Sequence, residues 1–260
     1  MDNSNIYFNI YIYIWFLQVP YPAWDDDWDG KESDSSETGI TRHILLVRHG
    51  QYDESHKEEE DQKRVLTPLG KQQAHLTGKR LAEMIRGHGT LYKACPVTTI
   101  VSSDMTRAKE TAAIIARYLP RSVIRSESDS FLNEGIPAQI IPMRPELNIQ
   151  QNLNENRKRI EAAFQKYIFR NTEKHTEDNP KSSERHEFEV IVCHGNVIRY
   201  FFCRALQLPP EAWLRMSTYN CSLTYLLIKP NGRVSARMMG DIGHLPYYKT
   251  SFSMHHGFIP

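Results

Sequence analysis

The chain has 260 residues, of which 40% are hydrophobic and 24% are charged, and its formal net charge is +1. The length allows one large α/β domain or two small ones, and the composition is that of an ordinary globular protein. A net charge so close to zero excludes the global positive field of a nucleic-acid-binding protein, so any anion site must be local.

Residues 1–41 come before the predicted domain and divide into an apolar stretch and a linker. The stretch from Ile6 to Val19 is interrupted by Asn9 and is shorter than the roughly 20 residues of a membrane-spanning helix. No Lys or Arg precedes it, so neither a secretory signal nor a transit peptide is well formed. A short anchor or membrane-surface segment over residues 6–19 and an unstructured start are both open readings. Residues 20–41 are polar and predict a linker.

One motif in the linker differs from its surroundings. The segment Trp24–Asp29 reads "WDDDWD" and places two large aromatic side chains among four acids. Indole rings are better buried against a partner than left in a solvated linker. The alternative is an exposed acidic tether with two incidental tryptophans.

A folded domain is predicted over residues 42–250, followed by a tail over residues 251–260. Three short apolar runs, each followed by a helical pattern, predict buried strands, and they are Ile44–Val47, Thr99–Val101 and Glu189–Cys193. The helix after the second run is expected to follow a turn at Ser102–Asp104 and to extend to about Leu119. Strands that alternate with helices indicate an α/β fold with a mostly parallel sheet covered on both faces.

Two further elements follow from local signals. Thr67 and Pro68 are typical of the N-cap and first position of a helix, which comes after a highly charged loop over residues 51–65. Residues 221–239 predict a hairpin with its turn at Pro230–Gly232.

Two of the predicted strands end in the same dipeptide. "ILLVRHG" ends in His49–Gly50 and "VIVCHGN" contains His194–Gly195. Ligands bind beyond the carboxyl ends of strands in open α/β sheets, so both histidines are predicted at a site. If the two strands are neighbours, the two imidazoles can face each other.

Basic groups converge on the same edge of the predicted sheet. Arg48 precedes the first histidine, and Arg107 lies about one turn into the helix that follows the second predicted strand. A helix N-terminus adds free backbone N–H groups and a partial positive charge. Two guanidinium groups, two imidazoles and helix termini predict a site for an anion, and phosphate suits it best.

The pattern also suggests a chemistry. A neutral imidazole is a nucleophile at neutral pH, so His49, at the mouth of the cationic pocket, can take a phosphoryl group while Arg48, Arg107 and His194 neutralise its charge. Glu134, an isolated carboxyl group in "LNEGIP", is the candidate acid for the leaving oxygen.

No metal or cofactor is predicted from the sequence. The chain contains no cluster of carboxylates or cysteines that suggests a metal, and its four cysteines fit neither a zinc site nor a disulfide framework. We therefore expect a metal-free reaction without a cofactor, and buried reduced thiols.

Four segments together resemble one protein family. They are Arg48–Gly50 ("RHG"), Ser102–Ala112 ("SSDMTRAKETA"), Glu134 and Cys193–Tyr200 ("CHGNVIRY"). In this order they resemble the histidine phosphatase superfamily, which has the phosphoglycerate mutase-like fold. The resemblance covers residues 42–250 and implies a three-layer α/β/α domain with a mostly parallel central sheet.

The resemblance also implies a role for each residue. It implies that His49 is transiently phosphorylated and that Glu134 is the proton donor. It implies that Arg48, Arg107 and His194 bind the phosphoryl group.

Other segments, such as "LTPLG" and "GDIGHLP", resemble a branch of mitochondrial serine/threonine protein phosphatases. This likeness implies a phosphoprotein substrate, a mitochondrial location, membrane association through residues 6–19 and homo-oligomers that form through Trp24–Asp29. The motif of the branch has Asn where this chain has Asp27. Preference among phosphoserine, phosphothreonine and phosphohistidine stays open.

Three alternative functions remain at this point. A phosphoglycerate mutase typically carries a longer closing segment after its acid, whereas "GIPAQIIPMRPE" follows Glu134 here. A small-molecule phosphatase would use the same pocket residues. A scaffold with little turnover is the non-catalytic alternative, and the complete set of five candidate residues argues against it.

Overall fold

The computed structural model describes residues 24–31, 39–87, 97–143, 153–171 and 185–252. The apolar stretch Ile6–Val19, Cys95 and residues 253–260 of the predicted tail lie outside the described residues.

The core of the molecule is one six-stranded sheet with the strand order β3-β2-β4-β1-β5-β6. Its strands are β1 (Ile40–Arg48), β2 (Val97–Ser102), β3 (Ile124–Arg125), β4 (Arg185–Cys193), β5 (Leu223–Ile228) and β6 (Val234–Asp241). The first four are parallel to one another, β5 runs antiparallel to β1, and β5 and β6 form an antiparallel hairpin. The mostly parallel sheet and the hairpin confirm the fold class predicted from the sequence.

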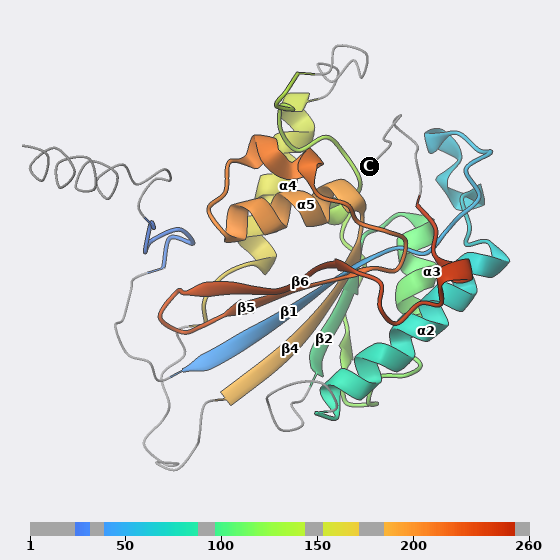
Figure 1. Cartoon of the computed structure of the whole chain (residues 1–260), viewed down its shortest axis with the longest axis horizontal. Helices are drawn as coiled ribbons and strands as arrows, with labels where there is room; N and C mark the ends of the chain where they lie inside the picture. Colours follow the sequence, from blue (N-terminus) through green and yellow to red (C-terminus); the bar gives the residue numbers. More distant parts are fainter. Residues whose placement is uncertain (1–23, 32–38, 88–96, 144–152, 172–184, 253–260) are drawn as a thin grey trace, which may run out of the picture.

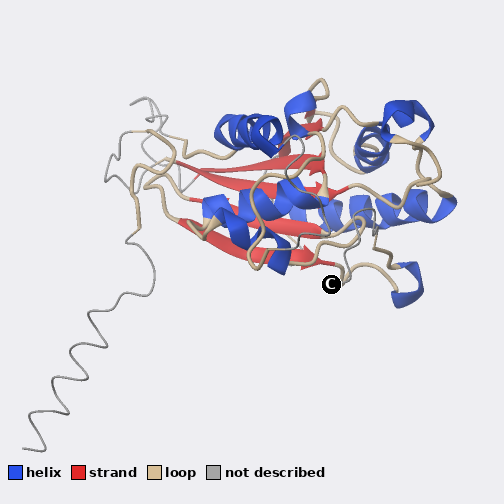
Figure 2. Cartoon of the chain, turned by 90° about the horizontal axis from the view of Figure 1, so that it is seen from above, coloured by secondary structure: helices blue, strands red, loops and turns tan. Residues whose placement is uncertain are grey.

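Helices cover both faces of this sheet (Figures 1 and 2). The α-helices are α2 (Pro68–Ile85), α3 (Thr106–Ile115), α4 (Leu153–Tyr167) and α5 (Gly195–Ala205). Short 3-10 helices are η1 (Glu58–Lys63), η2 (Ser130–Leu132), η4 (Pro210–Arg215) and η5 (Tyr247–Lys249).

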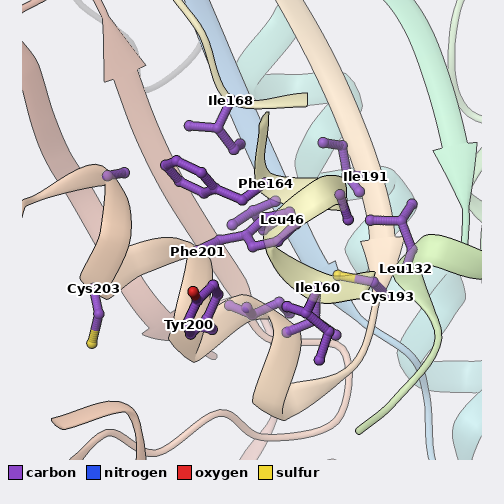
Figure 3. Packing of buried hydrophobic residues seen from close by; sticks show 14 of the residues in the cluster. Leu46, Leu132, Ile160, Phe164, Ile168, Ile191, Cys193, Tyr200, Phe201 and Cys203 are labelled. Carbon is purple, nitrogen blue, oxygen red and sulfur yellow. The ribbon is translucent and has the colours of Figure 1, made fainter. Parts of the chain in front are cut away.

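Alternate residues of β1 enter two different cores. Leu45 and Val47 pack with residues of α2 and α3. Ile44 and Leu46 pack on the opposite face with α4 and α5, where Phe164 and Phe201 meet edge to face at 5.7 Å (Figure 3). A strand buried on both faces explains the continuous apolar run in its sequence.

The parallel strands begin earlier than their apolar runs predicted. β1 starts at Ile40, four residues before the expected Ile44, because polar residues at its start find buried partners. Arg42 forms an ion pair with Glu189 of β4, and the ring of His43 hydrogen-bonds to the hydroxyl of Tyr225. A hydrophobicity pattern does not register buried polar residues whose partners come from distant parts of the chain.

The second strand–helix unit also differs in detail from its prediction. α3 begins at Thr106 and ends at Ile115, not near Leu119, so Arg107 is the second residue of the helix and not one turn into it. Thr67 caps α2 as predicted, because its Oγ1 accepts a hydrogen bond from the backbone N–H of Gly70 at 3.1 Å.

The WDDDWD segment lies on the chain's own domain and is not a free acidic tether. The indole Nε1 of Trp28 donates to the carbonyl of Gly232 at 2.9 Å, and its ring lies 6.1 Å from that of Phe164. Asp29 and Arg170 form an ion pair in which both side chains are buried, with Nη2 and Oδ1 2.8 Å apart. Trp24 keeps 39% of its surface exposed.

Two further observations concern the described cysteines and helices. Cys193, Cys203 and Cys221 are free and buried, as predicted. Within the ranges that the structure describes, no helix has both the length and the apolar character needed to cross a membrane.

Candidate active site

The two histidines predicted from the sequence lie side by side. β1 and β4 are parallel neighbours, and Arg48 at the end of β1 is in register with Cys193 at the end of β4. The residues that follow are therefore adjacent, and the ring centroids of His49 and His194 are 5.0 Å apart. Both residues are buried, with exposed fractions of 2% and 0%, so His49 does not lie at the pocket mouth expected from the sequence.

The hydrogen bonds of His49 fix which ring nitrogen carries the proton. Nδ1 lies 2.8 Å from the carbonyl oxygen of Gly50, which can only accept, so Nδ1 carries the hydrogen. Nε2 then has a lone pair, and Arg107 Nε donates to it at 3.3 Å. The arrangement presents Nε2 as a nucleophilic atom beside a guanidinium group.

Burial keeps both imidazoles neutral. The pKa of His49 lies well below its usual value because burial penalises the charged ring, and because Arg107 and Arg48 are close. The pKa of His194 is lowered in the same way by burial, then by Arg107 and His49. A neutral His49 is the form that can attack phosphorus.

Arg107 is held by a residue that sequence analysis did not single out. Asp61 of η1 accepts hydrogen bonds from the backbone N–H and Oγ1 of Thr106, at 2.7 and 2.9 Å. Its other oxygen lies 3.3 Å from Nη1 of Arg107. Met105, at the N-cap position of α3, makes no side-chain cap, so Asp61 takes over that function from another element.

Arg48 is held by residues from the C-terminal part of the chain. Its Nη1 donates to the carbonyl of Thr218 at 2.6 Å, and its guanidinium lies 5.3 Å from the ring of Phe252. Its Nε is buried and makes no hydrogen bond to any described residue. A buried guanidinium N–H without a partner is a donor ready for an anion.

Glu134 lies within electrostatic range of these arginines. Burial lowers the pKa of Arg48, and the carboxylate of Glu134 acts most strongly in the opposite direction. Burial also lowers the pKa of Arg107, with Tyr52 and Glu134 opposing it. Arg159 of α4 holds the loop by donating to the carbonyls of Asn133 and Glu134, at 2.6 and 3.0 Å. Glu134 therefore acts electrostatically on both arginines of the cluster formed with His49 and His194.

Two further residues, Tyr52 and Arg64, lie beside His49 and Arg107, and the sequence analysis did not predict them. The ring of Tyr52 lies 5.2 Å from that of His49, and the guanidinium of Arg107 lies 4.7 Å from its centre. The fully buried Arg64 donates to the hydroxyl of Tyr52 at 3.0 Å. Both come from the charged loop over residues 51–65, and the only sequence signal was an aromatic residue three positions after His49.

His194 has a partner outside the predicted set. Its Nε2 lies 2.8 Å from Oγ of Ser103, at the end of β2, and Ser103 lies 2.7 Å from Oδ1 of Asn133. The Nδ1 of His194 is buried and has no hydrogen-bond partner in the described part of the chain.

The cluster is cationic and is not a metal centre of the usual kind. Among the described residues, no three His, Cys, Asp or Glu side chains lie together as metal ligands would. Two guanidinium groups, two imidazoles and one carboxyl group suit the transfer of a phosphoryl group better than the binding of a cation.

Comparisons with known proteins agree with this geometry. A family model described as the histidine phosphatase superfamily (branch 1) matches residues 44–240. The serine/threonine-protein phosphatase PGAM5, mitochondrial, of Xenopus laevis is 45% identical over 90% of this chain and 87% of its own length. The human protein of the same name is 41% identical over 86% of this chain and 78% of its own length.

A solved structure gives the same result at the level of the fold. The crystal structure of a phosphoglycerate mutase from Plasmodium falciparum is 36% identical, covers 80% of this chain and 96% of its own, and superposes with a TM-score of 0.52. The family match and the identities of the relatives lead to one conclusion: this chain belongs to the histidine phosphatase superfamily.

Proposed function

We propose that the chain is a phosphoprotein phosphatase that works through a phosphohistidine at His49. The observation that carries this proposal is the lone pair of His49 Nε2, fixed by the Nδ1 bond to Gly50 and lying beside Arg107. The relatives that cover most of this chain are named serine/threonine-protein phosphatases. They are also named mitochondrial, and this chain shares that location.

In the first step, Nε2 of His49 forms a bond to phosphorus and the ester P–O bond breaks. The leaving oxygen takes a proton from the carboxyl group of Glu134 and departs as an alcohol. Arg48, Arg107 and His194 neutralise the oxygens of the phosphoryl group during transfer. Arg107 must turn its donors from His49 Nε2 toward those oxygens, because the attacking lone pair has to be free.

In the second step, a water molecule attacks the phosphorus atom of the phosphohistidine. The carboxylate of Glu134 takes the proton from this water, the N–P bond breaks and inorganic phosphate leaves. His49 and Glu134 return to their starting forms, so the cycle needs no metal and no cofactor.

A mutase or small-molecule phosphatase is the second candidate. The Plasmodium falciparum structure that matches at 36% identity is titled a phosphoglycerate mutase. The cluster at the sheet edge would serve either reaction, and a substrate panel distinguishes them.

The test is a substrate panel with the purified full chain in the presence of a chelator. We expect hydrolysis of p-nitrophenyl phosphate and of phosphothreonine and phosphoserine peptides, with 3-phosphoglycerate and a sugar bisphosphate turned over more slowly. His49→Ala should abolish hydrolysis, whereas His56→Ala, which changes a half-exposed histidine of the nearby loop, should leave it unchanged. Turnover of 3-phosphoglycerate alone would contradict the protein substrate, and an active His49→Ala variant would contradict the nucleophile.

We also propose that the protein forms homo-oligomers through the Trp24–Asp29 segment. On its own domain the segment occupies a surface that includes Phe164, Arg170 and Gly232. Residues 32–38 connect it to β1, and the same surface on a second copy offers identical contacts. Association of this kind, with an anchor in residues 6–19, would hold several catalytic domains at a membrane.

Size-exclusion chromatography with light scattering tests the assembly. Trp28→Ala should lower the oligomeric mass, because it removes the indole that contacts Gly232 and Phe164. Asp27→Ala, which changes an exposed side chain of the same segment, is the matched control and should elute like the unmodified chain. Equal masses for all three proteins would contradict the proposal.

A further inference from the structure

The proton positions around His194 can be read from a chain of hydrogen bonds that starts at the backbone. The N–H of Asp104 can only donate, and it lies 3.0 Å from Oδ1 of Asn133. This contact identifies the Asn133 atom as the amide oxygen. The hydroxyl of Ser103 lies 2.7 Å from the same oxygen, so it must donate to it.

The hydroxyl of Ser103 has one hydrogen, which is used in the bond to Asn133. Toward its other neighbours its oxygen can only accept, and it accepts from the backbone N–H of Met105 at 3.2 Å. His194 Nε2 lies 2.8 Å from the same oxygen and must therefore donate. The neutral ring of His194 thus carries its hydrogen on Nε2 and has a lone pair on Nδ1.

This tautomer is the opposite of that of His49, and it creates a conflict for phosphate binding. His49 needs a lone pair to attack, and it has one on Nε2. His194 needs a hydrogen to donate to a phosphoryl oxygen, but its only nitrogen without a partner, Nδ1, has a lone pair. The oxygens of a dianionic phosphoryl group are acceptors only, so neutral His194 cannot donate to them while Ser103 holds Nε2–H.

We propose that His194 takes up a proton on Nδ1 when the phosphoryl group binds, and that Ser103 and Asn133 are the positioning residues that impose this uptake. The proposal rests on the proposed function and adds to it the protonation state of the second histidine. The proton comes from solvent, an N–H bond forms at Nδ1, and no other bond changes. The imidazolium donates to Ser103 and to the phosphoryl group together, and loses the proton when phosphate leaves.

The charged groups that face His194 explain why the uptake waits for the ligand. Arg107 of α3, His49, Arg48 at the end of β1 and Arg159 of α4 each lower the pKa of His194 through their charges. These cations disfavour a further positive charge on a buried ring. A dianion between the guanidinium groups reverses this balance.

Sulfate is the probe that isolates this proton, because it stays a dianion across the neutral pH range and cannot supply the proton itself. Calorimetric titration of the full chain with sulfate at pH 7.5, in two buffers of different ionisation enthalpy, should show an uptake of about one proton per bound sulfate. Nitrogen-15 spectra of labelled histidine should show His194 protonated on Nε2 alone without sulfate and on both nitrogens with it.

Ser103→Ala separates the positioning role from a merely structural one. Without the acceptor at Nε2, the neutral ring can place its hydrogen on Nδ1 and bind the anion directly. Proton uptake should then fall toward zero, and sulfate affinity should lose the steep pH dependence, about tenfold per pH unit, that the unmodified chain shows where uptake is complete. Ser128→Ala is the matched control, because the hydroxyl of Ser128 bonds to Asp104 and not to His194.

Three results would overturn the proposal. An unmodified chain that binds sulfate without proton uptake, nitrogen-15 spectra in which His194 gains no proton with sulfate, or unchanged uptake in Ser103→Ala would each do so while the phosphatase function stands. A chain that does not bind sulfate and also fails to hydrolyse phosphopeptides would contradict the proposed function itself, and this inference with it.

Discussion

Asp61 is a residue outside the five candidate residues that holds one of them, Arg107, in place. It joins η1 to the first turn of α3 through Thr106, and the same carboxylate holds Nη1 of Arg107. Arg107 in turn reaches Nε2 of His49. The direction of the Arg107 guanidinium thus depends on an acid that comes from a loop far away in sequence.

Asp61→Ala should therefore lower kcat/KM for p-nitrophenyl phosphate by about tenfold, the effect of losing roughly 1.4 kcal/mol of transition-state stabilisation. Asp61→Asn retains an acceptor for Thr106 but loses the ion pair, so its kcat/KM should lie between those of the unmodified chain and Asp61→Ala. Steady-state kinetics check this, with Glu60→Ala as the control in the same 3-10 helix. Equal kcat/KM values for Asp61→Ala and Glu60→Ala would show that Arg107 does not depend on this carboxylate.

The residues that sequence analysis identified and those it missed differ in one physical respect. His49, Arg48 and His194 follow strand ends, and Arg107 opens the helix after one, so local pattern and sheet topology place them. Asp61 is one of six acids in residues 51–65, and nothing local distinguishes it from the others. Its role arises only when the loop folds back on α3.

At the scale of elements, the backbone at the start of α2 lies in direct contact with the backbone of the residues that follow β1. A Cβ atom added at Gly70 would stand 1.9 Å from the carbonyl oxygen of Gln51, and one at Gly50 would stand 2.7 Å from the carbonyl of Gly70. Thr67 fastens the same junction by donating to the side chain of Gln51 at 2.7 Å. This contact places the segment that carries His49 directly on the first turn of a helix.

Gly70→Ala should force α2 away from this segment and destabilise the fold by about 3 kcal/mol, the upper range for overpacking. Urea unfolding gives the free energy, and the surviving folded protein should have a lower kcat because His49 moves. Gly243→Ala adds a methyl group whose nearest heavy atom is a side-chain oxygen at 3.3 Å, and it should change stability by less than about 0.5 kcal/mol. Wild-type stability in Gly70→Ala would contradict the close approach.

Local sequence signals predicted which helices and strands form more accurately than they predicted where each one begins and ends. The cap of α2 at Thr67 was predictable because a hydroxyl and a following proline act within one turn. The early start of β1 was not, because Arg42 and His43 are polar residues that became buried only through Glu189 and Tyr225 on other strands.

At the scale of the whole molecule, four buried or half-buried histidines have lowered pKa values and make the stability of the fold depend on pH. Burial, with the neighbouring His186, lowers the pKa of His43 to about 3, and burial lowers that of His244 to about 4. His49 and His194 have pKa values well below normal for the reasons given above. In the unfolded chain each of them binds a proton near pH 6.5.

The free energy of unfolding should therefore be at its full value above pH 6.5 and should fall as the pH drops below it. Each such histidine contributes a loss of about 1.4 kcal/mol per pH unit. Urea unfolding at pH 7.5, 6.5 and 5.5 measures the slope. His43→Gln should make it shallower by about that amount, whereas His56→Gln should not. An unchanged slope in His43→Gln would mean that His43 is not kept neutral in the folded protein.

The global architecture was predictable from the alternation of strands and helices, and the WDDDWD contacts were not. Apolar runs that alternate with helical patterns predict a mostly parallel sheet with covered faces, and the structure has one. The surface that receives Trp28 and Asp29 is assembled from Phe164, Arg170 and Gly232, which are distant in sequence. Only the folded chain brings them together.

The most direct test of the account is to locate the phosphoryl group during turnover. The full chain is mixed rapidly with a phosphothreonine peptide, quenched in alkali, which preserves phosphohistidine, and mapped by mass spectrometry. The account predicts a phosphoryl group on His49, formed and lost at rates that match turnover, and none in His49→Ala. A phosphoryl group on another residue, or full turnover with His49 never modified, would contradict it.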